Sequence, residues 1–190
     1  MNKINYVVGN AALCTEGDEK TGLILHVVDN TGAWSGTEIA SALDAVSCYP
    51  RYIYRRLTRY RSPDCLLGKI SACNLYRSGQ TRDPMITKFV HVAHLFARDG
   101  VHHSFRYGYF HQALEIVSRR YSRSYAIHMP RIKYGVAGNS WDIIENIIQD
   151  ALVDTGFTVY VYDRPKDSFK DFQDRLEGES NEPYHFTNSE

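Results

Sequence analysis

The stretch HMPRIKYGVAGNSWDIIENII, residues 128–148, changes its hydrophobic period halfway and so limits the folds open to this chain. Before Gly135 the pattern is typical of a strand. After Ser140 the apolar residues share one face of a helix, namely Trp141, Ile143, Ile144, Ile147 and Ile148. A strand followed directly by a helix is the repeating unit of α/β proteins, in which helices cover a largely parallel sheet.

The rest of the sequence alternates in the same way. Strands are predicted at 3–8, 23–28, 66–75, 86–96, 125–132 and 157–162, and helices at 38–48, 51–61, around 110–117 and at 141–153. The segment 77–85 is predicted to be a hairpin-like loop. The sequence therefore predicts one α/β domain with a mixed or mainly parallel sheet, followed by a polar, mostly acidic tail at 164–190.

Composition excludes several classes of protein. Lys and Arg total 22, as do Asp and Glu, so the chain has no overall charge bias toward nucleic acid or membranes. No apolar run reaches the 18 residues of a membrane span, and the N-terminus lacks the apolar segment of a signal peptide. The four cysteines show no metal-binding spacing, so we expect a reduced, cytoplasmic monomer with no metal.

Two glycine-containing loops, residues 29–37 and 133–140, each follow a predicted strand and precede a helix. Unpaired N–H groups and the helix dipole make such a position favourable for an anion, and small residues let a phosphate approach the backbone. Asn139 or Ser140 is expected to cap the second helix. The alternative interpretation is a plain tight turn. The sequence matches neither the P-loop nor the Gly-x-Gly-x-x-Gly pattern, and no cofactor is expected.

The stretch IHMPRIKYGVAGNSW resembles the macro domain family, in the bacterial and phage form of the branch that includes terminal ADP-ribose glycohydrolases and ADP-ribose-1''-phosphate processing enzymes. The stretches YVVGN, ILHVVDNTGAWSGTEIASAL and FTVYVYD are similar to other motifs of that family, in the same order. The resemblance implies a macro domain over residues 1–163, with a three-layer α/β/α fold that binds ADP-ribose or an ADP-ribosylated substrate at the strand ends.

The resemblance also implies which residues contact the ligand. Near the adenine it places Gly9, Asn10 and Ala11, with Tyr160 or Tyr162 flanking the ring. Around the distal ribose and a phosphate it places Asp29, Asn30, Ser35, Gly36 and Thr37. Around the diphosphate it places Gly135, Val136, Ala137, Gly138 and Asn139, with Lys133 beside them.

Departures from the family pattern leave the activity open. Asn10 replaces the usual adenine-contacting Asp, and Lys133 replaces a Gly. The Lys and Asp that do the chemistry in some glycohydrolases correspond to Ala97 or Arg98, and to Ala137. Because Arg does not act as a base near neutral pH, the covalent Lys mechanism is not expected. One hypothesis is therefore a hydrolase of a mono-ADP-ribosyl linkage or of ADP-ribose-1''-phosphate, and the other is a non-catalytic reader or sequestering protein.

The stretch FARDGVHHSFRYGY, residues 96–109, offers other groups for catalysis. His103 has the right ordinary pKa to accept a proton from water, Arg106 suits a phosphate, and Asp29 could orient the ribose. The alternative is an exposed loop with ordinary surface residues, and an Asx turn at Asp29. His26 lies inside an apolar strand and is interpreted as a core histidine rather than a base.

The basic segment RYIYRRLTRYR, residues 51–61, interleaves Tyr and Arg. Such a segment could contact nucleic-acid phosphates and stack on bases, so nucleic acid is a further possible partner. The alternative is a solvated helix face with buried Tyr. Trp34 and Trp141 each follow a glycine-containing loop and are interpreted as packing anchors for these loops.

Overall fold

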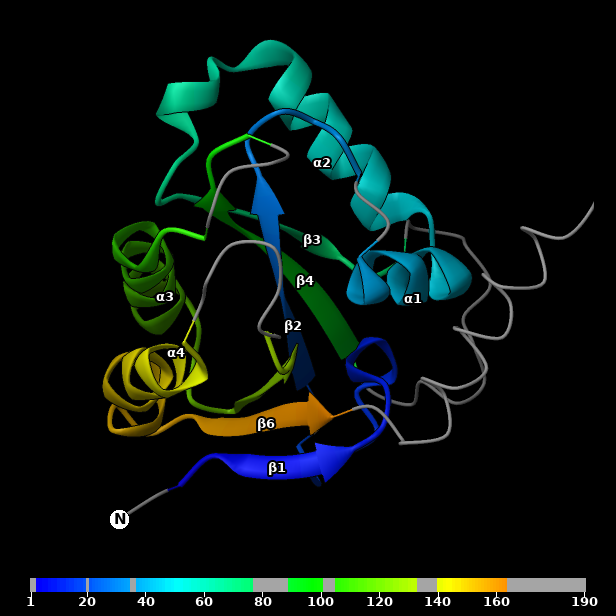
Figure 1. The fold of residues 1–190 in the computed structure, drawn as a ribbon. Coiled ribbons are helices and arrows are strands. Elements are labelled where there is room, and N and C mark those ends of the chain that lie inside the picture. The colour runs from blue at the N-terminus through cyan, green and yellow to red at the C-terminus, as the bar shows by residue number, and fades with distance from the viewer. Residues whose placement is uncertain are drawn as a thin grey trace, which may run out of the picture.

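The computed structural model describes residues 3–19, 21–34, 37–76, 89–100, 105–132 and 140–163. These residues form one six-stranded sheet with helices on both faces (Figure 1). The predicted α/β class and three-layer arrangement are confirmed. The tail at 164–190 and the predicted loop at 77–85 lie outside the described residues.

The sheet is parallel except at one edge. Its strands are β1 (Asn5–Val8), β2 (Thr21–Asp29), β3 (Ile70–Asn74), β4 (Phe89–Arg98), β5 (Tyr125–Pro130) and β6 (Thr158–Asp163). They lie in the order β1-β6-β5-β2-β4-β3, and only the β3–β4 pair is antiparallel. Because β2 is central and covered on both faces, it reads as a nearly continuous apolar run.

The helices form two layers. On one face lie α1 (Glu38–Val46), α2 (Tyr49–Tyr60) and the short 3₁₀ helix η1 (Ala11–Leu13), and η2 (Pro63–Cys65) follows α2. On the other face lie α3 (Tyr107–Arg120) and α4 (Trp141–Ile148), which a π-helical turn, η3 (Gln149–Val153), extends. All four predicted helices are therefore confirmed. None of the described helices is long and apolar enough to span a bilayer.

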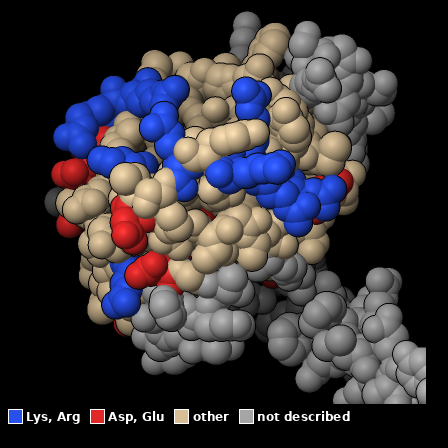
Figure 2. Space-filling view, turned by 90° about the horizontal axis from the view of Figure 1, so that it is seen from above, with Lys and Arg blue, Asp and Glu red and all other residues tan. Residues whose placement is uncertain are grey.

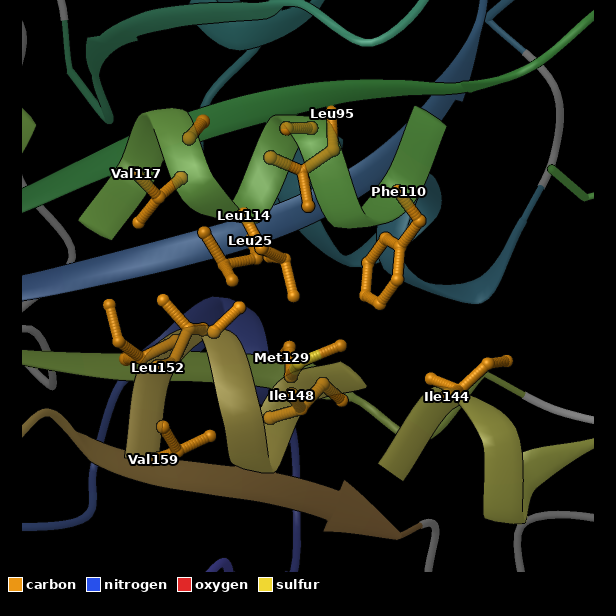
Figure 3. Packing of buried hydrophobic residues seen from close by; sticks show 14 of the residues in the cluster. Leu25, Leu95, Phe110, Leu114, Val117, Met129, Ile144, Ile148, Leu152 and Val159 are labelled. Carbon is orange, nitrogen blue, oxygen red and sulfur yellow. The ribbon is translucent and has the colours of Figure 1, made fainter. Parts of the chain in front are cut away.

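The core between the sheet and the α3/α4 layer contains one large hydrophobic cluster. Leu25, Leu95 and Met129 project from the strands toward the helical residues Phe110, Leu114, Val117, Ile144, Ile148 and Leu152 (Figure 3). Each of these side chains is at most 1% exposed. The helical spacing that predicted α3 is thus the spacing of the residues that it buries, and the same holds for Ile144 and Ile148 of α4. Ile143, predicted on the same face of α4, is 47% exposed, because one residue turns an α-helix by about 100° away from Ile144.

Several predicted strand boundaries were wrong by one to four residues. The strand expected at 66–75 begins only at Ile70, because η2 and a turn at Gly68 come first. Gly68 has φ 73°, a conformation that suits glycine, and its N–H donates to the carbonyl of Phe96 (2.9 Å). The strand expected at 125–132 ends at Pro130.

Candidate functional site

The carboxyl edge of the sheet contains a topological switch point between β2 and β5. The chain leaves β2 toward the α1/α2 layer, and it leaves the neighbouring β5 toward α4 on the other face (Figure 1). In open α/β sheets ligands bind in the crevice at such a point. The two glycine-containing loops predicted from the sequence begin here, and their neighbouring origins are the geometric basis of the candidate site.

Part of this site lies outside the described residues. That part includes the predicted catalytic His103 and the predicted ligand contacts Ser35, Gly36, Lys133, Gly135, Val136, Ala137, Gly138 and Asn139. Their roles stay predictions. The residues described below are those that lead into and out of these segments.

Asp29, at the end of β2, begins a tightly bonded turn. Its Oδ1 accepts hydrogen bonds from the backbone N–H of Thr31 (2.8 Å), the hydroxyl of Thr31 (2.7 Å) and the hydroxyl of Tyr54 (2.7 Å). The Tyr54 oxygen also accepts from the N–H of Gly32 (3.1 Å). Burial and the Asp29 carboxylate both raise the pKa of Tyr54, so its hydroxyl stays protonated and donates. The Asx turn, given above as the alternative interpretation of Asp29, is therefore present, with α2 as its support.

Asn30 connects the β2 loop to the loop after β4. Its Nδ2 donates to Oδ1 of Asp99 (3.1 Å) and to the carbonyl of Pro63 (3.3 Å), and its Oδ1 accepts from the N–H of Gly100 (2.9 Å). The side chain is 3% exposed, and the protein itself supplies partners for both ends of its amide. Asp99, which the sequence places in the 96–109 stretch, is thus brought to the β2 loop.

Two arginines of the same stretch point to different environments. Arg98 lines a small cavity beside the β2 loop with His26, Asp29, Trp34 and Tyr54. Arg106 is exposed at the N-cap position of α3, where it shares an open depression with Asp99 and Tyr109. Phe105 between them is a core residue, 4% exposed. Of the predicted catalytic residues, Asp29 therefore lies within the loop network and Arg106 on the neighbouring surface.

The segment after β1 is held by a backbone hydrogen bond to β6 and by the Asn10 side chain. Gly9 N–H donates to the carbonyl of Asp163 (2.9 Å), and Oδ1 of Asn10 accepts from Ala12 N–H (2.9 Å) as the N-cap of η1. Ala11 is 3% exposed. Asn10 thus has a local structural role, while contact of this segment with an adenine remains a prediction.

The two tyrosines predicted to flank the adenine lie on β6, on the η1 side of the sheet. Tyr162 is 3% exposed, and its hydroxyl is 2.8 Å from Nδ1 of His128. Tyr160 is half-buried and stacks on the same imidazole, with ring centroids 5.4 Å apart. Tyr160 therefore exposes more surface to a ligand than Tyr162 does.

The residues on either side of the segment 133–139 make an ion pair and contacts with aromatic side chains. Arg131 makes two hydrogen bonds to the Asp163 carboxylate (2.6 and 2.8 Å), and its guanidinium lies over the rings of Tyr6 (4.6 Å) and Trp141 (4.8 Å). At the other end, the N–H of Ser140 donates to the Tyr107 hydroxyl (2.7 Å). Trp141 is thus a packing anchor, as predicted.

The helix caps differ from one loop to the other. Ser140 occupies the N-cap position of α4, but among the described residues its side chain makes no capping hydrogen bond. Thr37, predicted to contact the ligand, is the N-cap of α1, and its hydroxyl accepts from Ala40 N–H (3.4 Å). Of these two N-cap residues, Thr37 is therefore the one whose side chain makes a capping hydrogen bond in the described part of the chain.

His26 lies under the β2 loop and is 2% exposed, so the core interpretation is confirmed. Burial lowers its pKa well below the ordinary value, and His94 and Arg98 act in the same direction. Its ring packs edge-on against Trp34, with ring centroids 5.0 Å apart. Trp34 Nε1 in turn donates to Oδ2 of Asp44 (3.0 Å). Trp34 is therefore a packing anchor, as predicted.

Sequence reasoning missed the supporting roles of Tyr54, Tyr107 and Arg131. A signal existed for Tyr54, because it lies at helical spacing from Leu57 and Thr58 on the less polar side of the 51–61 segment. Tyr107 and Arg131 carried no such signal, since their partners are 33 and 32 residues away along the chain.

No family model matches the chain. It is 27% identical over 167 residues to the mouse chromodomain-helicase-DNA-binding protein 1-like; the match covers 86% of this chain and only 18% of that protein's length.

Solved structures give likenesses over most of this chain. A macrodomain protein from Streptomyces coelicolor is 27% identical, with a TM-score of 0.66 over 86% of this chain and 100% of that one. The macrodomain of Thermus aquaticus DarG is 18% identical, with a TM-score of 0.60 over 84% and 97% of the two chains. Thermosipho africanus DarTG, in complex with ADP-ribose, is 14% identical, with a TM-score of 0.63 over 88% of this chain and 43% of that one. The strand order, the two helical layers and these likenesses together show that the chain has the fold of the macrodomain family.

Proposed function

We propose that this protein binds ADP-ribose at the carboxyl edge of its sheet. The observation that carries the proposal is the β2/β5 switch point, from which two glycine-containing loops lead to helices in opposite layers. Thermosipho africanus DarTG, of which 43% matches this chain, is in complex with ADP-ribose, which supports the choice of ligand. An NAD-derived nucleotide with two phosphates suits a switch point at which two such loops begin.

In this proposal each segment has one task. Residues 133–139 hold the diphosphate near the N-terminus of α4, where the helix dipole favours negative charge. Asp29, Asn30 and Ser35 to Thr37 surround the distal ribose, and Gly9 to Ala11 lie by the adenine, with Tyr160 or Tyr162 at its flank. Asn10 offers the adenine amine an uncharged acceptor where relatives have a carboxylate.

Calorimetric titration with ADP-ribose tests this assignment, with AMP and NAD as controls. We expect micromolar binding selective for ADP-ribose, and its loss in Gly135→Glu, because a carboxylate would repel the diphosphate. A matched Gly135→Ala variant adds little bulk and no charge and should bind more tightly than Gly135→Glu. Unchanged affinity in a folded Gly135→Glu protein would contradict the loop assignment.

We further propose that the protein hydrolyses an ADP-ribose derivative, either a mono-ADP-ribosyl linkage or ADP-ribose-1''-phosphate. His103 would accept a proton from water, Arg106 would bind a phosphate, and Asp29 would hold the ribose through its turn. The exposure of Arg106 beside Asp99 supports its role. Arg106→Ala should lower kcat more than it changes KM, whereas Arg119→Ala, exposed at the far end of α3, should leave both unchanged.

A reader or sequestering protein is the second candidate function. It is favoured by the hydrogen bonds that engage Asp29 and Asn30 within the protein, and by Ala97 and Arg98 at the positions of the family's catalytic Lys. Tight ADP-ribose binding together with no release of phosphate or ADP-ribose at high protein concentration would establish this function. Measurable turnover, lost in Arg106→Ala, would establish the hydrolase instead.

A monomer in a reducing, cytoplasmic environment is part of the proposal. Cys48 and Cys65 are exposed thiols, which suit a reducing compartment. Sedimentation velocity at micromolar protein concentration, with and without ADP-ribose, tests the monomeric state.

A further inference from the structure

Helix α2 has two faces with different tasks. Its inner face buries Pro50 and Tyr54, and the Tyr54 hydroxyl donates to the Asp29 carboxylate. Thr58, one turn further on, lies next to Gly32 of the β2 loop. The helix is therefore fixed to the body of the protein through that face. The outer face is not needed for this packing and presents a different set of residues.

The outer face consists of two rows at i, i+4 spacing. One row is Arg51, Arg55 and Arg59, and the other is Tyr52, Arg56 and Tyr60; together with Cys48 they line an open groove along the helix. Successive members of a row lie about 6 Å apart, because four residues of an α-helix rise that far. A regular line of cations thus runs beside a line with an aromatic ring at each end.

This groove concentrates positive charge in a chain with no net charge. Figure 2 shows Lys and Arg gathered on the face of the molecule that α2 occupies. Within the described part of the chain, α2 makes one ion pair, Arg51 to Asp44 (3.1 Å), and Asp64 follows in η2. Arg55, Arg56 and Arg59 are exposed, as are Tyr52 (56%) and Tyr60 (74%).

We propose that the outer face of α2 is a docking surface for single-stranded nucleic acid. The arginine row would contact successive phosphates, and Tyr52 and Tyr60 would stack on bases. Unpaired bases are required, because a duplex hides the base faces that the two rings need. This surface is distinct from the proposed ADP-ribose site and does not depend on it, since the Tyr54–Asp29 bond lies on the inner face.

The residues of α2 favour this partner over other polyanions. A membrane-binding helix inserts an apolar face, but the apolar face of α2 packs against the protein. An acidic peptide would use the arginines but not the exposed surface of the Tyr60 ring or of the Tyr52 ring, which also stacks on Tyr49 (ring centroids 6.2 Å apart). Stacking on Tyr is tolerant of base identity, so we expect weak sequence preference.

Fluorescence anisotropy with a labelled 20-mer of thymidylate tests the proposal over a range of salt concentrations. Arg55→Gln/Arg59→Gln should weaken binding at least tenfold and reduce the slope of log K against log salt by about 1.4, since two phosphate contacts are lost. The control, Arg119→Gln/Arg120→Gln, removes the same charge from exposed positions on α3 and should change neither quantity.

A second variant separates stacking from charge. Tyr60→Ala should weaken binding by about fivefold or more without changing the salt slope, because one base loses its aromatic partner. Tyr60 is largely exposed, so the variant is expected to fold. Protection of Cys48 from a thiol reagent by the oligonucleotide, with Cys65 unprotected, would place the strand in the groove.

Three outcomes would overturn the proposal. Equal weakening by the α3 control would mean that the oligonucleotide binds by general charge. Equal affinity for duplex and single-stranded DNA, together with unchanged affinity in Tyr60→Ala, would mean that the surface binds anions in general and does not stack on bases. Tighter binding to vesicles of phosphatidylserine and phosphatidylcholine than to the oligonucleotide would make the partner a membrane.

Discussion

The two faces of the central sheet are built from different chemistry. Toward α3 and α4 the sheet buries one continuous cluster of apolar side chains. Toward α1 and α2 it buries smaller apolar clusters together with His26, His94, Asp29 and the hydroxyl of Tyr54. Apolar packing has no preferred direction, whereas hydrogen bonds fix particular atoms relative to one another. We infer that the first face supplies most of the stability and the second positions the β2 loop.

The largest expected effect comes from the apolar face. Leu114 on α3 is 0% exposed, and Leu114→Ala should lower the free energy of unfolding by about 2–5 kcal/mol through lost burial and a cavity. Urea denaturation measures the loss. The affinity of the remaining folded protein for ADP-ribose should be unchanged, because the β2 loop lies on the other face.

Ile143→Ala is the matched control on the same layer. Ile143 is 47% exposed, so its truncation should change the free energy of unfolding by no more than about 0.5 kcal/mol. A loss as large as that of Leu114→Ala would contradict the assignment of the core.

The polar face should give the protein a pH dependence. Burial lowers the pKa of His94 from 6.5 to about 4, although the hydrogen bond with the Pro50 carbonyl acts in the opposite direction. At a pH between these two pKa values, His94 binds a proton in the unfolded chain but not in the folded protein. The free energy of unfolding should therefore fall as pH drops from about 6.5 to about 4, by up to about 3 kcal/mol from His94, and His26 acts in the same direction.

Urea denaturation at several pH values measures this slope. His94→Gln removes the titrating group and should flatten the dependence in that window, while His111→Gln, at an exposed position of α3, should leave it intact. Parallel curves for the wild-type protein and His94→Gln would show that His94 does not carry the effect.

A third prediction concerns the hydroxyl that supports the β2 loop. Tyr54→Phe keeps the ring that stacks on Phe96 but removes the donor to Asp29, which should cost about 1–3 kcal/mol of stability. If the loop holds the ribose, ADP-ribose affinity should also fall, about tenfold. Tyr52→Phe removes an exposed hydroxyl on the same helix and should change neither stability nor affinity. If Tyr52→Phe also lowered the affinity for ADP-ribose, the fall seen in Tyr54→Phe could not be assigned to the bond between Tyr54 and Asp29.

The smallest predicted effect is at the N-cap of α1. Thr37→Ala removes the oxygen that accepts from Ala40 N–H. Because that hydrogen bond is long (3.4 Å), the free energy of unfolding should fall by only about 0.5 kcal/mol, the low end for loss of an N-cap. Thr37→Ser keeps the cap and serves as the control. If both variants lose ADP-ribose affinity while only the first loses stability, the methyl group of Thr37 contacts the ligand.

Local sequence signals predicted most of the elements of this fold. The spacing of Phe110, Leu114 and Val117 predicted α3, since periodicity follows from which face is buried. Boundaries were less well predicted: at 66–69 a turn at Gly68 replaces strand, because its N–H pairs with Phe96 from a distant part of the chain. Within the candidate site, the turn at Asp29 was the alternative interpretation of the sequence, and the Tyr54 hydroxyl that completes it was not predicted.

By itself the sequence determined the alternation of strands and helices, the two glycine-containing loops and the arginine–tyrosine pattern of residues 49–60, because each depends on residues close together in the chain. Only the tertiary structure decided the strand order that creates the switch point between β2 and β5. It also decided the contacts of Asn30 with Asp99, of Arg131 with Asp163 and of Ser140 with Tyr107. Those pairs are separated by 32 to 69 residues, so they exist only after the sheet has brought the carboxyl ends of its strands together.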